Sequence, residues 1–148
     1  MREIRTERII NAPPADVWDV LTDISSYPDW NPHLVNATVN SDLRVGSNLE
    51  VLVRREGARD QSMNVTVTEL EPGRKLAWVG TLLSPLLFSG RHTFELEPFS
   101  NNRTRFINRE EIRGILASLV TTATPERDYE AMNEALKQQV ETAAAAPA

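Results

Sequence analysis

Six consecutive segments of the chain alternate apolar and polar residues with a period of two, and this alternation constrains the fold more than any other feature. The segments cover residues 35–41, 47–56, 61–71, 74–81, 88–98 and 103–112. Such a period is typical of antiparallel strands that bury one face. Between two of them, Glu71-Pro72-Gly73-Arg74 is the most specific turn signal, because proline and glycine favour tight turns. The sequence therefore predicts an antiparallel sheet over most of its length.

The two ends of the chain carry other patterns. Residues 4–11 read as a strand, and the following "NAPPADVWDVLTDI" predicts a short helix that ends near Ser25, with prolines in its first turn. From Gly114 onward, apolar residues recur every three or four positions, which indicates one long helix or two consecutive ones. Thr124-Pro125-Glu126 either starts a new helix or kinks a continuous one.

This order of elements predicts a single α+β domain over residues 1–143 and a disordered tail over residues 144–148. The economical arrangement is a curved antiparallel sheet of about seven strands wrapped around the long C-terminal helix, with short helices after the first strand. At 148 residues, the chain is long enough for one such domain. A sheet that grips a helix often leaves space between the two, and that space is where we expect a site.

The stretch "SSYPDWNPHL", Ser25 to Leu34, places large aromatic residues in an irregular connection, because its two prolines disfavour a helix. We expect Tyr27 to pack on the first helix and Trp30 to fold inward, as core rather than as a ligand contact. His33 is expected at the surface rather than in a catalytic position.

Composition excludes several classes of function. The net charge is −5 and no basic stripe is present, so we do not expect nucleic acid as a partner. Without cysteine, disulfides, thiolate metal sites and cysteine nucleophiles are ruled out, and the two histidines lack metal-ligand spacing. There is no glycine-rich phosphate loop and no G-x-S-x-G motif. We expect neither a metal nor a cofactor.

The N-terminal segment "MREIRTERII" has no long apolar run, so it predicts neither a secretory signal nor a membrane-spanning helix. A cytoplasmic location without stable membrane insertion is the default expectation. Whether the protein is a monomer or a homodimer stays open.

Three motifs together cover nearly the whole chain: "APPADVWDVLTDISSYPDWNP", "ELEPGRKLAWVG", and "EEIRGILASLV" with "YEAMNEALKQQVE". They resemble the polyketide cyclase/dehydrase branch of the START-like (SRPBCC, helix-grip) superfamily. The resemblance implies a deep cavity between the sheet and the C-terminal helix, and a lipid, polyketide, hormone or other hydrophobic molecule as ligand. Some members are cyclases, some carry ligands and some contact chaperones, so the fold does not decide among these functions.

The inward parity of the predicted strands is mostly aliphatic or aromatic, with His92, Asn108 and Glu110 as polar exceptions. An apolar pocket with a few convergent polar groups is the usual form of a small-ligand site, although each apolar position is also explained as core. The candidate ligand-binding residues are Trp30, Val51, Val53, Met63, Val65, Trp78, Leu82, Phe88, His92, Phe94, Phe106, Asn108, Glu110, Leu116, Leu119 and Val120.

Residues 88–98 and 103–112 are joined by a short connection and predict a hairpin that places His92 near Asn108. A histidine beside a carboxylate can act as a general acid or base, so His92 and Glu110 are the catalytic candidates. The alternative is a structural pair. The leucine-rich residues 82–88 either pack under the C-terminal helix, or have a functional role as a lip of the cavity or a contact with a membrane-borne ligand.

Because this catalytic constellation is thin, the sequence favours a carrier, sensor or storage protein for a small hydrophobic molecule, either a lipid or a polyketide-like compound. One alternative is a polyketide cyclase or dehydratase that works without a cofactor through His92 and Glu110. The other is a chaperone-type protein-interaction module.

Overall fold

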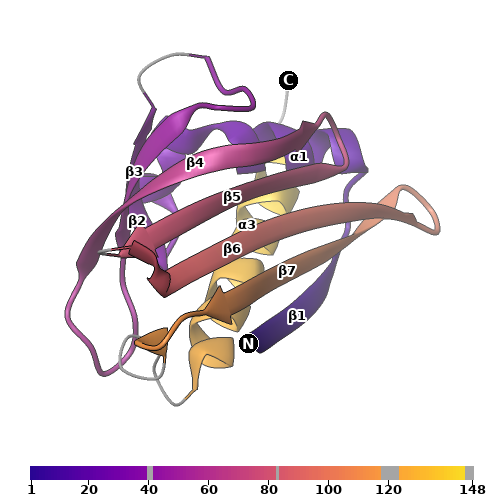
Figure 1. Cartoon of the computed structure of the whole chain (residues 1–148). Helices are drawn as coiled ribbons and strands as arrows, with labels where there is room; N and C mark the ends of the chain where they lie inside the picture. The colour runs from indigo at the N-terminus through magenta and orange to yellow at the C-terminus, as the bar shows by residue number, and fades with distance from the viewer. Residues whose placement is uncertain (40–41, 83, 118–123, 146–148) are drawn as a thin grey trace.

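The computed structural model describes residues 1–39, 42–82, 84–117 and 124–145. Its seven strands form one antiparallel sheet in the order β1-β7-β6-β5-β4-β3-β2, so each strand from β2 to β7 pairs with its neighbours in the chain and β1 closes the edge beside β7 (Figure 1). The prediction of a curved antiparallel sheet around a C-terminal helix is confirmed. The strands are β1 (Arg2–Ile10), β2 (Leu34–Val39), β3 (Asn48–Val53), β4 (Gln61–Glu71), β5 (Lys75–Leu82), β6 (Ser84–Phe99) and β7 (Arg103–Arg113).

Two short helices follow β1: α1 (Pro14–Thr22) and the 3-10 helix η1 (Ile24–Asp29). The long helix α3 (Pro125–Ala145) begins with proline at its first position, where the missing N–H costs least. A helix therefore starts at Pro125, one of the two alternatives above. The stretch 118–123, where a helix from Gly114 would continue, lies outside the described residues. Helix α3 extends two residues into the predicted tail, and residues 146–148 are not described.

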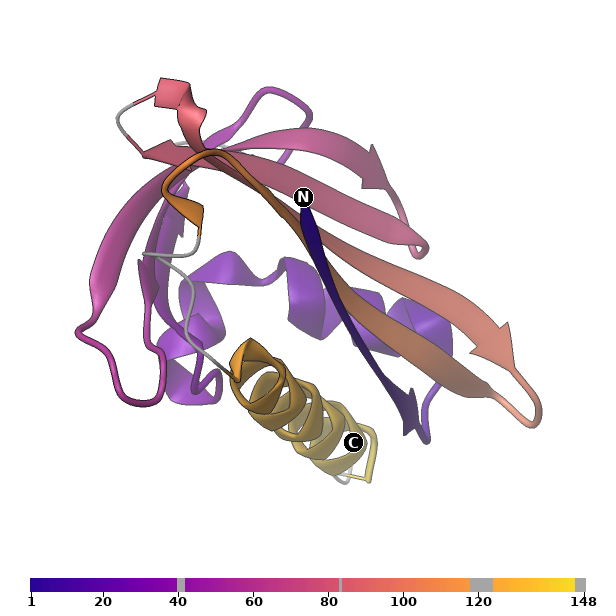
Figure 2. The same ribbon diagram turned by 60° about the horizontal axis from the view of Figure 1, so that its bottom comes forward.

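The sheet arches over α3, with α1 and η1 beside the helix under the same face (Figure 2). Helix α3 packs mainly along β1 and against α1, not across the middle of the sheet. Consequently, β3, β4, β5 and β6 curve away from the helix, and the space beneath them is where a cavity can form.

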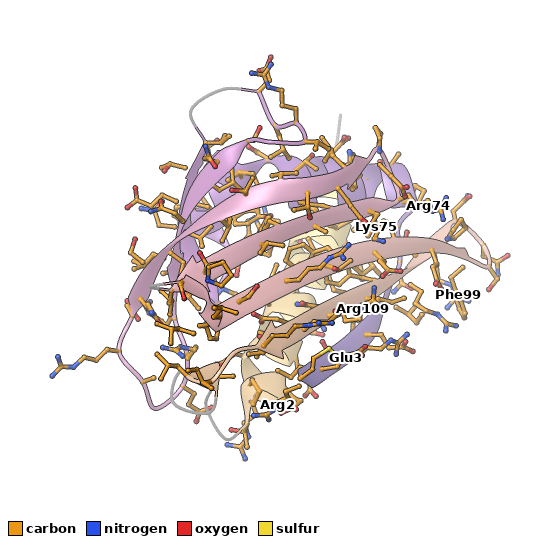
Figure 3. All side chains as sticks on the ribbon, in the orientation of Figure 1. Arg2, Glu3, Arg74, Lys75, Phe99 and Arg109 are labelled. Carbon is orange, nitrogen blue, oxygen red and sulfur yellow. The ribbon has the colours of Figure 1, made fainter. Side chains whose placement is uncertain are left out.

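The inner face carries the predicted parity. Phe94 and Phe106 are fully buried and stack with ring centroids 6.0 Å apart, and Trp78 meets Phe94 edge-on at 5.2 Å. The outer face is charged: Lys75 and Arg109 lie there, away from α3 (Figure 3), and pair with Glu69 and Glu95 at 2.7 and 2.8 Å. The alternation thus reports the two faces correctly.

The "SSYPDWNPHL" connection behaves as predicted for its two large aromatic residues. Tyr27 is fully buried, and its hydroxyl donates to the backbone C=O of Leu21 in α1 over 2.5 Å. Trp30 is half-buried, packs against the main core and meets the Tyr27 ring edge-on at 5.3 Å.

His33, in contrast, is not at the surface, and that expectation was wrong. The Asn31 carboxamide oxygen accepts hydrogen bonds from the backbone N–H groups of His33 and Leu34, at 3.0 and 2.9 Å. This local turn directs the imidazole inward, where the ring is buried and its Nδ1 lies 2.9 Å from the backbone oxygen of Arg54.

Candidate functional site

A cavity lies between strands β3 to β7 and the first turn of α3. The centres of water-sized molecules have about 80 Å³ available in it. One water needs roughly 10–15 Å³ on this measure, so the space suits roughly five to eight waters or one compact organic molecule. Its described lining consists of Leu34, Val51, Val53, Met63, Val65, Trp78, Gly80, Leu82, Phe88, Gly90, Ile112 and Pro125, with the polar residues His33, Arg55, Gln61, His92, Glu110, Asp128 and Tyr129.

Two glycines in the lining let neighbouring side chains pack closely against the wall of this cavity. Gly80 and Gly90 are buried, face the interior and pair directly across β5 and β6. A Cβ on Gly80 would lie 3.0 Å from the Met63 and Val65 side chains, and one on Gly90 would lie 2.9 Å from Glu110 Oε1. Neither glycine has a positive φ, so the absence of a side chain, rather than backbone freedom, is what the site uses.

The polar end of the cavity is built from three elements. His92 on β6 is the direct cross-strand partner of Glu110 on β7, and its Nδ1 lies 3.7 Å from Glu110 Oε2. The Tyr129 hydroxyl, on α3, donates to that same carboxylate oxygen. The His33 ring packs edge-on against Tyr129 with centroids 5.1 Å apart. The His92 ring lies 5.4 Å from the Tyr129 ring, so both histidines of the chain contact Tyr129.

Burial shifts the pKa values of this cluster in opposite directions. It raises the pKa of Glu110 to about 7, against a smaller opposing effect of the Arg55 charge. It lowers the pKa of His92 to about 3, although the hydrogen bond to Asn108 partly opposes this. At neutral pH, His92 is therefore a neutral imidazole, while Glu110 exchanges a proton near physiological pH.

The Glu110 shift predicts how stability depends on pH. A carboxyl group whose folded pKa is raised stabilises the fold fully below its unfolded pKa of about 4.5, and this contribution is lost as pH rises through about 7. The Glu110→Gln variant has no such loss. We expect its free energy of unfolding relative to wild type to increase by up to about 3 kcal/mol between pH 4.5 and pH 8.

Urea unfolding of both proteins across this pH range measures the difference between their free energies of unfolding. The buried histidines contribute an opposite pH dependence to both proteins, and this contribution cancels in the difference. A difference that stays constant with pH would show that Glu110 is not held in an environment that favours its neutral form.

Most of the predicted ligand-binding positions meet in this cavity. Those that line it are Val51, Val53, Met63, Val65, Trp78, Leu82, Phe88, His92 and Glu110. His92 and Asn108 are in contact as predicted, although the direct cross-strand partner of His92 is Glu110 and that of Asn108 is Phe94.

Other predicted positions lie elsewhere. Phe94, Phe106 and Asn108 are buried further along β6 and β7, toward the end that α1 covers, and Trp30 packs against the main core. Leu116 is half-buried outside the lining, where its N–H bonds to the Leu87 carbonyl oxygen over 2.9 Å. Leu119 and Val120 lie outside the described residues.

The leucine-rich segment divides between its two interpretations. Leu82 and Phe88 line the cavity, and Phe88 clusters with Tyr129 of α3, whereas Leu86 is 84% exposed. Leu83 lies outside the described residues.

Sequence reasoning missed several lining residues. Gly80 and Gly90 were detectable in principle, since glycine within a strand pattern often marks a close approach of a ligand or another chain segment. Half-exposed Arg55, Gln61 and Asp128 border the solvent side, and their convergence depends on contacts between distant segments. In one of these contacts, the backbone N–H of Glu56 donates a hydrogen bond to Asp128 Oδ1 over 3.1 Å.

Within the described part of the chain, no group of three or more histidine, aspartate or glutamate side chains is arranged to hold a metal ion. No helix among the described residues is both long and apolar enough to cross a membrane.

A seven-stranded antiparallel sheet gripping a C-terminal helix, with a cavity enclosed between them, defines the helix-grip, START-like class of proteins. The chain belongs to the family described as polyketide cyclase / dehydrase and lipid transport, whose model matches residues 1–141. The resemblance found in the sequence is therefore confirmed. None of the curated proteins matches the chain.

Solved structures share the fold. The ZhuI aromatase/cyclase from Streptomyces sp. R1128 is similar with a TM-score of 0.79 and 19% identity, over 98% of this chain and 96% of that one. A START superfamily protein from Mycobacterium smegmatis has a TM-score of 0.74 and 16% identity, over 95% of this chain and 97% of its own. Norcoclaurine synthase from Thalictrum flavum has a TM-score of 0.74 and 16% identity, over 97% of this chain and 96% of its own. At these identities, the likeness concerns the fold alone.

Proposed function

We propose that this protein binds a compact hydrophobic molecule in the cavity between the sheet and α3, as a carrier, sensor or storage protein. The observation that carries the proposal is the cavity itself, which has about 80 Å³ available to the centres of water-sized molecules and is lined by the paired Gly80 and Gly90. Protein interiors are normally packed with few voids larger than a water molecule. A void that is apolar on its walls and polar at one end is the usual form of a ligand site.

The lining supports a ligand that is mainly apolar. Val51, Val65 and Trp78 are almost fully buried around the space, so water inside it has few partners over most of its surface. Each apolar Å² that a ligand removes from water contributes roughly 25 cal/mol. The volume favours a molecule of a few rings or a short chain over a long-chain lipid.

Native mass spectrometry of the purified protein, followed by solvent extraction, tests for a retained ligand. Titration with ethylbenzene, observed by NMR at the methyl groups of Val51, Val65 and Met63, tests the cavity directly. We expect saturable shifts at these methyl groups. Shifts confined to surface positions, together with no retained compound, would contradict the proposal.

A second candidate function, a cyclase or dehydratase, is favoured by one observation: His92 Nδ1 and Glu110 Oε2 lie 3.7 Å apart inside the cavity. A neutral imidazole can accept a proton while a carboxyl group with a pKa near 7 donates one, and such pairs typically accelerate reactions about 10²–10⁴-fold. For a β-ketone chain capable of intramolecular aldol closure, we expect the His92→Ala, Glu110→Gln double variant to lose at least about a hundredfold in rate. Unchanged turnover would exclude this pair as the catalytic groups.

A further inference from the structure

A continuous chain of buried hydrogen bonds ends at His92. The His92 Nε2 lies 2.5 Å from Asn108 Oδ1, and Asn108 Nδ2 lies 3.0 Å from Asn133 Oδ1 on α3. Asn133 Nδ2 in turn lies 2.8 Å from Thr6 Oγ1 on β1. All four side chains are buried, so this series of hydrogen bonds links β6, β7, α3 and β1 out of contact with water.

The direction of this chain follows from its far end. The Thr6 hydroxyl lies 3.4 Å from the backbone oxygen of Asn108, and a carbonyl oxygen can only accept, so Thr6 donates there. Its lone pair must then accept from the amide N–H₂ of Asn133. The Asn133 side-chain oxygen therefore accepts a hydrogen bond from the amide N–H₂ of Asn108.

A second contact gives Asn108 the same orientation independently. Its Nδ2 also lies 3.8 Å from the thioether sulfur of Met132, which is an acceptor without a proton to give. Both anchors place the Asn108 oxygen toward His92. The neutral imidazole must therefore carry its proton on Nε2, which leaves a lone pair on Nδ1.

His92 Nδ1, at the polar end of the cavity, is consequently an acceptor. It lies 3.7 Å from Glu110 Oε2, which is too far for a hydrogen bond. Glu110 Oε2 already accepts from the Tyr129 hydroxyl, so a proton on this carboxyl group resides on Oε1. His92 Nδ1 and Glu110 Oε2 therefore both accept toward the gap between them, and a protonated Glu110 donates from Oε1 instead.

We propose that the ligand carries a hydroxyl group that donates its hydrogen bond to His92 Nδ1, and that Asn108 and Asn133 are positioning residues that hold His92 in the accepting tautomer. The inference rests on the proposed function, because it names the class of ligand for the same cavity. A ketone or ether oxygen would meet these two acceptors without a donor, which costs the unpaired group its hydration. An ammonium ion fits poorly, since a cation would have to leave water among apolar walls.

Three related probes that share the ethylphenyl group separate these possibilities: para-ethylphenol, para-ethylanisole and ethylbenzene, titrated by calorimetry into the full-length protein. We expect ethylphenol to bind at least about tenfold more tightly than the other two, because only its hydroxyl completes the hydrogen bond. If ethylbenzene binds and ethylphenol has no advantage, the donor preference is overturned while the proposed function stands. If none of the three binds, the proposed function fails and the preference fails with it.

The tautomer can be measured without any ligand. Long-range ¹H–¹⁵N NMR of the His92 ring should show a protonated Nε2 and an unprotonated Nδ1. A protonated Nδ1 would overturn the positioning role whatever the probes do.

Variants then test whether the hydrogen bonds from Thr6 to Asn108 hold the His92 tautomer. In Asn108→Leu, His92 loses its acceptor, so we expect the proton to move to Nδ1, which then donates toward Glu110, and the ethylphenol preference to fall to about twofold or less. Thr6→Val is the milder second variant: it removes only the anchoring hydroxyl, and we expect a mixture of tautomers. An unchanged tautomer in both variants would show that the chain does not position His92.

Thr104→Val is the matched control. Thr104, like Asn108, is fully buried on the inner face of β7, but its hydroxyl donates to the Ala12 carbonyl oxygen over 2.7 Å, away from His92. It should lose comparable stability and leave both the tautomer and the preference unchanged. A change in either would mean that general loosening of the core, rather than loss of the chain, alters the site.

Discussion

Replacing Gly80 with valine is expected to weaken the binding of compact hydrophobic ligands at least a hundredfold, which corresponds to about 3 kcal/mol of binding free energy. The new side chain would project from β5 into the cavity, 3.0 Å from the Met63 methyl group at its Cβ. Met63 ends in a flexible thioether that can move aside, but the Val65 methyl group, also 3.0 Å from the new Cβ, belongs to a stiff branched side chain. We therefore expect the protein to stay folded with a loss of about 1–3 kcal/mol in unfolding free energy.

The control for this variant lies one residue further along the same strand. Thr81 is exposed, so Thr81→Val places a valine on the opposite face of β5, outside the cavity. We expect its ligand affinity to equal that of wild type. Tight binding by a folded Gly80→Val protein would show that ligands occupy a place other than this cavity.

Gly114→Ala is expected to destabilise the protein by about 2–4 kcal/mol, more than an ordinary glycine substitution. Gly114 follows β7 with φ +111°, and a Cβ there would lie 2.4 Å from the Leu87 backbone oxygen. Both the strained backbone and the overlap with backbone atoms oppose the substitution. The contact matters because the next residues pair with β6: Leu116 N–H donates to the Leu87 carbonyl oxygen over 2.9 Å.

Gly73→Ala measures the conformational part of this effect alone, so the difference between the two variants gives the steric part. Gly73 lies in the turn between β4 and β5 with φ +73°, and a Cβ there would meet nothing within 4 Å. We expect this variant to lose only about 1 kcal/mol, as conformational strain alone predicts. Equal losses at Gly73 and Gly114 in denaturant unfolding would show that the overlap with Leu87 has no energetic consequence.

The fold could be predicted because its signals are local. The alternation along each strand reports which side chains face inward, and it correctly placed Val51, Trp78 and His92 on the inner face. The short connection between β6 and β7 was enough to bring His92 close to Asn108 and Glu110. Turn residues and helical spacing gave the remaining elements to within a few residues.

The cavity itself could not be predicted in the same way. Its place depends on α3 packing along β1 rather than across the sheet, and its wall depends on the close approach of Met63, Val65 and Glu110 to Gly80 and Gly90. Both depend on contacts between residues far apart in the chain. The prediction for His33 was wrong for a similar reason, because the turn in which the His33 backbone N–H donates to the Asn31 side-chain oxygen is not visible in any periodicity.

A crystal structure of the protein grown with para-ethylphenol would show where the ligand lies. We expect one molecule between the sheet and α3, with its ring against Gly80 and Gly90 and its hydroxyl oxygen roughly 2.6–3.2 Å from His92 Nδ1. Ethylphenol bound only outside the cavity, or inside it with the hydroxyl pointing away from His92 and Glu110, would contradict this expectation.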